Sequence, residues 1–181
     1  MRALVLGTSS DAGKTVTCAM ICRYLARKGL DPVPFKASNL SLNSYATRDG
    51  GEIGMGQTFQ AWCCGLEPET DMNPVLLKPS GDGRIQLIVG GRPLVDLSGD
   101  SEEGRDAARK EIVEAFRRLS SEHGFVVCEG SGSPAELNLM DRDMANVGLM
   151  RSVGVPTILV GDIERGGVFA AIYGTWRLIP D

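Results

Sequence analysis

The chain has 181 residues, 43% of them hydrophobic and 23% charged, and its 19 basic and 23 acidic residues leave a formal net charge of −4. This composition is typical of a soluble globular domain and shows no basic excess that would favour nucleic acid as a partner. No stretch approaches the roughly 18 consecutive apolar residues of a membrane span. The first apolar run, residues 3–6, is too short for a signal peptide. We therefore expect no membrane segment.

The five cysteines favour free thiols over disulfides or a metal site. Their number is odd, and Cys63 and Cys64 are adjacent, which disfavours a disulfide framework. His123 is the one histidine, and no second cysteine pair has ligand spacing. We expect reduced, mostly buried thiols and a cytoplasmic location.

The first predicted element is a short strand, residues 3–6, followed by the glycine-rich turn GTSSDAGKT and an amphipathic helix that ends at Gly29. This order predicts a phosphate-binding loop, in which backbone N–H groups point at phosphate oxygens. Five residues separate Gly7 from Gly13, where the common pattern has four. The alternative, a plain Gly/Ser turn, is disfavoured by the flanking strand and helix. The expected nucleotide-binding residues are Gly7, Thr8, Asp11, Ala12, Gly13, Lys14 and Thr15.

The remaining elements predict an α/β fold, with a mostly parallel sheet covered by helices on both faces. We expect residues 37–51, rich in Ser, Asn and Gly, to form a long functional loop. The expected strands are 32–35, 74–78, 85–89, 125–128 and 156–160. The expected helices are 53–64, a segment between Ser101 and His123, 139–152 and 167–178.

Each predicted buried strand is followed by glycine or a polar residue, in turn Gly7, Lys36, Glu129 and Asp162. Ligands of parallel sheets gather at the carboxyl ends of the strands, so these exits predict one shared active site. Lys36 is either a solvated strand-end lysine or a cation aimed at a transferring phosphoryl group or a substrate carboxylate. Asp162 begins either a simple turn or a loop that contacts phosphate or a neighbouring subunit.

Two carboxylates are candidate Mg²⁺ ligands, with Thr15 as a hydroxyl ligand. Glu129 has the stronger case, because it follows a buried strand and precedes Gly130. Asp49, which precedes Gly50, could equally be a turn residue.

Several longer stretches, in one order along nearly the whole chain, resemble the cobyric acid synthase family, and in particular its N-terminal ATP-binding domain. They are GTSSDAGKT at 7–15, PFK at 34–36 with LNS at 42–44, GGEIG at 50–54, DMNPVLLKP at 71–79, EGSGSPAE at 129–136, and Asp162 with RGGVFA at 165–170. The wider loop also matches relatives of dethiobiotin synthetase, whose P-loop NTPase fold this domain shares.

The resemblance implies a glutamine-dependent amidoligase of cobalamin biosynthesis. Such an enzyme uses MgATP to phosphorylate carboxylates of adenosylcobyrinic acid a,c-diamide, and ammonia then displaces the phosphate. By match of motif, Lys14 and Thr15 hold phosphates and Mg²⁺, Lys36 neutralises the transferring group, and Asp49 and Glu129 bind Mg²⁺. The roles of Asn73 and Lys78, in a characteristic stretch, stay open.

The family pattern continues beyond what this chain supplies. Its members carry a glutaminase domain with a Cys-His-Glu triad, for which residues 1–181 offer one histidine and no elbow cysteine. We therefore expect residues 1–181 to be an ATP-binding synthetase domain that is cut short at its C-terminal end. Because enzymes related to this family often form dimers with the site near the interface, the resemblance adds a homodimer as a hypothesis. As isolated, the domain could also bind nucleotide without turnover.

The sequence leaves three other functions open. Cobyrinic acid a,c-diamide synthase shares the fold and reaction but acts on different carboxylates. Dethiobiotin synthetase has a similar loop and uses carbon dioxide chemistry. A chromosome-partitioning ATPase would carry a signature lysine where this chain has Ser9.

Overall fold

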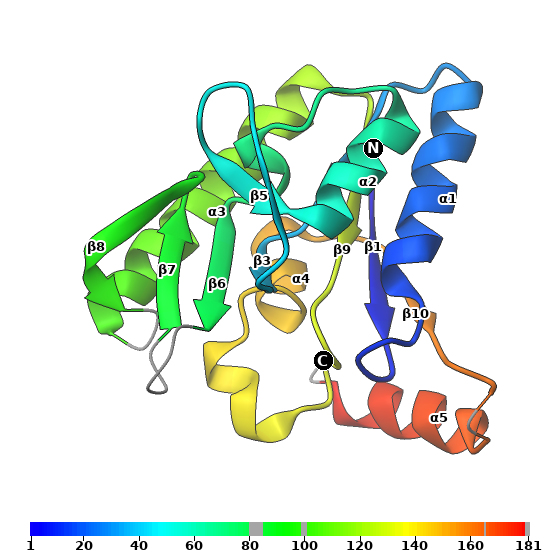
Figure 1. The fold of residues 1–181 in the computed structure, drawn as a ribbon. Helices are drawn as coiled ribbons and strands as arrows, with labels where there is room; N and C mark the ends of the chain where they lie inside the picture. The colour runs from blue at the N-terminus through cyan, green and yellow to red at the C-terminus, as the bar shows by residue number, and fades with distance from the viewer. Residues whose placement is uncertain (80–84, 99–100, 165, 180–181) are drawn as a thin grey trace.

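The computed structural model describes residues 1–79, 85–98, 101–164 and 166–179 (Figure 1). Its first half contains β1 (Arg2–Gly7), α1 (Lys14–Arg27), β2 (Pro32–Phe35), β3 (Ser38–Leu40), β4 (Ser44–Ala46), β5 (Glu52–Gly54), α2 (Met55–Cys64), η1 (Thr70–Met72), β6 (Val75–Pro79) and β7 (Ile85–Val89). Its second half contains β8 (Arg92–Ser98), α3 (Glu102–Glu122), β9 (Phe125–Glu129), η2 (Leu137–Arg142), α4 (Val147–Val153), β10 (Thr157–Val160) and α5 (Val168–Leu178).

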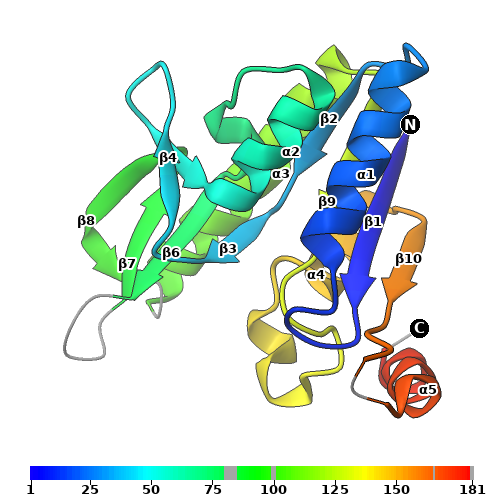
Figure 2. The same cartoon turned by 45° about the vertical axis from the view of Figure 1, so that its right-hand side comes forward.

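The main sheet is parallel, in the order β10-β1-β9-β2. Alternate residues of its central strands face opposite layers, as the period of a strand requires. Val5 and Val127 pack against Cys18 and Cys22 of α1. Their neighbours along the two strands face the layer that holds α3 and α4 (Figures 1 and 2). The predicted parallel sheet with helices on both faces is therefore confirmed.

A second sheet, in the order β3-β6-β7-β8, adjoins the first. Its β3 follows β2 after only Lys36 and Ala37, so Lys36 lies where the chain passes from one sheet into the other. Pro32 and Pro34 are compatible with β2 because it is an edge strand of the main sheet, where a missing N–H breaks no ladder. The strands β6, β7 and β8 pair antiparallel.

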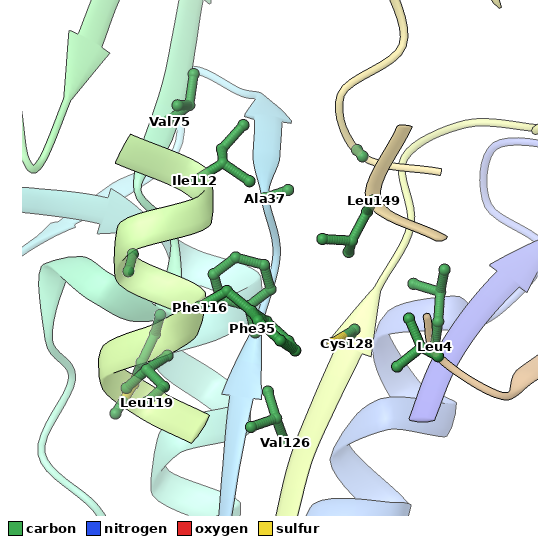
Figure 3. Packing of buried hydrophobic residues seen from close by; sticks show 14 of the residues in the cluster. Leu4, Phe35, Ala37, Val75, Ile112, Phe116, Leu119, Val126, Cys128 and Leu149 are labelled. Atoms are coloured by element: carbon green, nitrogen blue, oxygen red, sulfur yellow. The ribbon is translucent and has the colours of Figure 1, made fainter. Parts of the chain in front are cut away.

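Aromatic and aliphatic side chains from both sheets meet at α3 (Figure 3). Phe35 of β2 and Phe116 of α3 pack edge to face, with ring centroids 5.4 Å apart and an interplanar angle of 70°. Ile112 and Leu119 lie on the same buried stripe of α3. This contact fixes β2, and with it the position of Lys36.

The structure corrects two predicted segments. Residues 37–51 are not an irregular loop, because they contain β3 and β4, and β4 forms an antiparallel hairpin with β5. Residues 139–152 do not form one helix. The chain breaks between η2 and α4 because the Asp143 carboxylate accepts hydrogen bonds from the N–H groups of Ala145, Asn146 and Gly148, which starts a new turn.

All five cysteines are free thiols, as predicted. Cys18, Cys22 and Cys128 are buried, and a hydrogen bond with Cys64, together with burial, raises the pKa of Cys22. Among the described residues, no helix combines the length and apolar character needed to cross a bilayer.

We expect Phe116→Ala to lower the free energy of unfolding by about 3–5 kcal/mol, because it removes the ring that packs on Phe35 and leaves a cavity. Urea denaturation followed by circular dichroism measures this change. Phe169→Ala is the matched control, since Phe169 is 86% exposed and removal of its ring should change the stability by no more than about 0.5 kcal/mol. Equal effects of the two substitutions would contradict this assignment of the core.

Candidate nucleotide-binding site

The carboxyl ends of β1, β9 and β2 lie side by side at one edge of the main sheet (Figures 1 and 2). A cavity of about 410 Å³ opens there, between the turn that follows β1 and the start of β3. The lining residues that sequence patterns had singled out are Asp11, Gly13, Lys14, Thr15, Lys36 and Glu129. The sequence predicted that the residues after four strands meet at one site. The structure brings together those at the ends of β1, β9 and β2, but not Asp162 after β10.

The turn after β1 has the backbone of a phosphate-binding loop. Gly13, directly before α1, has a φ of 98°, and Asp11 has a φ of 58°, so both lie in the left-handed region that favours glycine. Gly7 contacts the loop lysine, since a Cβ at this position would lie 2.8 Å from Lys14 Nζ. Of the other predicted residues, Ala12 is buried and Thr8 donates its N–H to Val160 O. Neither lines the cavity.

Lys14 holds two loops together. Its Nζ donates to Ser9 O at 2.8 Å and to Gly132 O at 2.7 Å. Burial lowers the pKa of Lys14, and the nearby charge of Lys36 lowers it further. The lysine of the phosphate loop is thus a buried cation at the cavity wall, between the β1 exit and the β9 exit.

The Glu129 carboxylate is buried and accepts hydrogen bonds from four side chains. Its Oε1 accepts from Thr15 Oγ1 and from Lys36 Nζ, each at 2.8 Å. Its Oε2 accepts from Gln60 Nε2 at 2.6 Å and from Gln57 Nε2 at 3.2 Å. A buried carboxylate is tolerated only with such compensation.

Gln57 and Gln60 are the site residues that sequence reasoning missed. Both lie on α2 and are fully buried, and Gln60 Nε2 also donates to Thr15 O at 3.2 Å. Within the described part of the chain, the side-chain oxygen of each glutamine has no hydrogen-bond partner. Their spacing of three residues on one helix face was the only signal that could have revealed them.

The backbone around Lys36 is fixed by Asn73, whose role the sequence had left open. The Asn73 amide donates to Lys36 O and to Val75 O, each at 3.0 Å, and its Oδ1 accepts from Gly54 N at 2.9 Å. Lys36 N donates to Met72 O. Asn73 thus links the β2 exit to β6 and to the start of α2.

Asp49 lies in the turn of the β4–β5 hairpin. Figures 1 and 2 show this hairpin turn away from the phosphate loop that follows β1. Its side chain is exposed, and the Thr47 hydroxyl, which donates to its carboxylate, lowers the pKa of Asp49. The structure therefore does not bring Asp49 to Glu129. It places Asp49 in a turn, which is the alternative that the sequence offered.

Lys78 and Asp162 also lie outside the cavity wall. The Lys78 ammonium forms an ion pair with the Glu52 carboxylate. Asp162 Oδ1 accepts from Glu164 N at 2.9 Å in a turn after β10. Arg165, from the same sequence stretch, lies outside the described residues.

The profile of the CobQ/CobB/MinD/ParA nucleotide binding domain (CbiA) matches residues 3–179. The chain belongs to this family. Its α/β P-loop fold and its character as a nucleotide-binding domain follow from that membership.

Curated relatives of this nucleotide-binding domain are about half identical to it along its whole length. It is 53% identical over 182 residues to "Probable cobyric acid synthase" of Methanoculleus marisnigri, covering 100% of this chain and 37% of that protein. It is 52% identical over 177 residues to "Cobyric acid synthase" of Hyphomonas neptunium, covering 97% of this chain and 36% of that protein. It is also 52% identical over 180 residues to "Cobyric acid synthase" of Rhodococcus jostii, covering 98% of this chain and 35% of that protein. The chain therefore spans little more than a third of these relatives' length.

We expect Gln60→Ala to weaken Mg²⁺-dependent nucleotide binding about 10-fold or more, because it removes a donor that orients the Glu129 carboxylate. Binding of a fluorescent ATP analogue, titrated with and without Mg²⁺, measures the change. Gln86→Ala, at an exposed position of β7, should leave both affinities unchanged. Equal loss of affinity with and without Mg²⁺ would mean that Gln60 only supports the fold.

We expect nucleotide affinity to fall as the pH is raised toward the ordinary lysine pKa of about 10.4. Burial lowers the pKa of Lys14 in the free protein, and bound phosphate oxygens would raise it again, so the complex holds more protons than the free protein. Calorimetry in buffers of different ionisation enthalpy should detect this proton uptake. Lys14→Ala should abolish it, and Lys110→Ala, at an exposed position of α3, should not.

Proposed function

We propose that this domain binds MgATP and activates carboxylates of a corrinoid for amide formation, the reaction of a cobyric acid synthase. The observation that carries the proposal is the cluster of Lys14, Lys36 and Glu129 around one cavity. The relatives named cobyric acid synthase, about half identical over the length of this chain, support the choice of substrate.

The residues at the cavity fit a magnesium nucleotide. Mg²⁺ prefers oxygen ligands and keeps several waters, so one hydroxyl and one carboxylate suffice beside phosphate oxygens. Thr15 and Glu129 offer this pair on the cavity wall, with Oγ1 and Oε1 2.8 Å apart. These two residues would hold Mg²⁺, which when bound would neutralise charge on the phosphates. We do not extend this role to Asp49, which lies in the hairpin.

The proposed reaction has two steps. An oxygen of the substrate carboxylate forms a bond to the γ-phosphorus of ATP, and the bond between that phosphorus and ADP breaks. The nitrogen of ammonia then bonds to the acyl carbon, phosphate leaves, and the nitrogen loses a proton. Phosphoryl transfer depends mainly on positioning and on neutralising charge. Lys14 and the loop N–H groups would hold the phosphates, and Lys36 would neutralise the transferring group.

The proposal also covers the source of the ammonia and the number of chains in the assembly. In the whole enzyme, ammonia would come from hydrolysis of glutamine by a separate glutaminase domain. Within residues 1–181 we assign activation of the carboxylate only, with a homodimer as a further hypothesis.

We expect this chain, given MgATP, ammonium chloride and adenosylcobyrinic acid a,c-diamide, to produce amidated corrinoids detectable by mass spectrometry. Lys36→Met should lower the rate about 100-fold or more, because a charge that stabilises the transition state is lost. Lys36 also binds the Glu129 carboxylate, so nucleotide affinity is measured in parallel, and the rate should fall by a larger factor than the affinity. Lys110→Met is the matched control. A wild-type chain that binds ATP and yields no amidated corrinoid would contradict the proposed activity.

A further inference from the structure

A second cavity, of about 420 Å³, adjoins the nucleotide cavity. It lies between the start of the second sheet, at β3 and β6, and the segment that runs from β9 through η2 to α4. The two cavities share four lining residues, Ser10, Leu40, Ser131 and Gly132. A ligand in the second cavity would therefore touch the rim of the nucleotide site.

The second cavity continues from the Lys36 end of the nucleotide site. Ser38 and Leu40, which line the second cavity, belong to β3 and follow Lys36 by two and four residues. The Glu129 carboxylate accepts hydrogen bonds from Lys36 and from Thr15. In the proposed function, the transferring phosphoryl group therefore lies at the Lys36 end of the nucleotide cavity. An acceptor carboxylate must reach that end.

The walls of the second cavity differ in chemistry. Hydroxyl groups come from Ser38 and Ser133, whereas Leu77, Met140 and Met144 form an apolar surface. Leu40 is 59% exposed at the shared rim, as expected of an apolar side chain that a ligand covers. Methionine side chains are flexible and adapt to irregular apolar ligands.

Both carboxylates on this wall accept hydrogen bonds from backbone N–H groups. Asp143 accepts three N–H groups at the start of α4, and Glu136 Oε1 accepts from Ser133 N at 3.3 Å. Among the described lining residues none is basic, so the cavity suits the uncharged part of a ligand. The cations that would attract a carboxylate, Lys14 and Lys36, line the adjoining nucleotide cavity.

We propose that the second cavity is the acceptor subsite. It takes the apolar ring edge and neutral side arms of a large ring ligand, while one carboxylate arm crosses the rim at Ser10 and Gly132 toward Lys36. This inference rests on the proposed function, because the direction of the arm follows from phosphoryl transfer at Lys36.

The test fills the cavity without touching the nucleotide site. Met140→Trp places a large ring where the ligand edge would lie, and Met144→Trp does so from a second position. Leu137→Trp is the matched control, because Leu137 is 56% exposed on the same η2 segment and does not line the cavity. Binding of adenosylcobyrinic acid a,c-diamide is followed by equilibrium dialysis, and binding of a fluorescent ATP analogue in parallel.

We expect Met140→Trp and Met144→Trp each to weaken corrinoid binding and to raise its KM by 10-fold or more. Nucleotide affinity should stay within two-fold of the wild type, and Leu137→Trp should change neither. If the wild type amidates the corrinoid and both filled variants bind it normally, the subsite is wrong and the proposed function stands. If the filled variants lose nucleotide instead, the cavity holds part of the nucleotide. If the wild type binds nucleotide but not the corrinoid, both proposals fail.

Discussion

The site depends on one buried carboxylate. Glu129 ends a central strand of the parallel sheet, and its two oxygens accept hydrogen bonds from the phosphate-loop helix, from the β2 exit and from α2. A carboxylate in this position would be strongly unfavourable without those donors. The same contacts that make its burial possible therefore fix Thr15 and Lys36 at the edge of the nucleotide cavity.

Packing behind the sheet supports this arrangement. Phe35 precedes Lys36 and is held against Phe116 of α3, while Asn73 binds the Lys36 carbonyl oxygen. The lysine backbone is thus fixed by an aromatic contact and by hydrogen bonds to the residues around η1. Its side chain can then direct a charge at one point, which is what charge stabilisation in a transition state requires.

The sequence predicted those parts of the site that depend on local order. The phosphate loop, Lys36 and Glu129 each follow a short apolar strand, and parallel pairing brings such exits together. Gln57 and Gln60 were not predicted. Helical spacing indicates which residues share a helix face, but it does not indicate which carboxylate that face contacts. The place of Asp49 could not be predicted, because it depends on the β4–β5 hairpin, which the Ser- and Asn-rich sequence did not reveal. The edge strand β8 was also missed, since Pro93 disfavours a strand everywhere except at an edge or bulge.

One hydrogen bond of Lys14 lies where the two cavities meet. Its ammonium binds the carbonyl oxygen of Gly132, in a loop whose residues line both cavities. Phosphate oxygens compete for the same ammonium, so a nucleotide that draws Lys14 away alters the restraint on that loop. Thermodynamic linkage then requires reciprocity: whatever factor the nucleotide imposes on affinity in the second cavity, a ligand there imposes on the nucleotide. One lysine would in this way couple the affinities of two ligands in adjoining cavities.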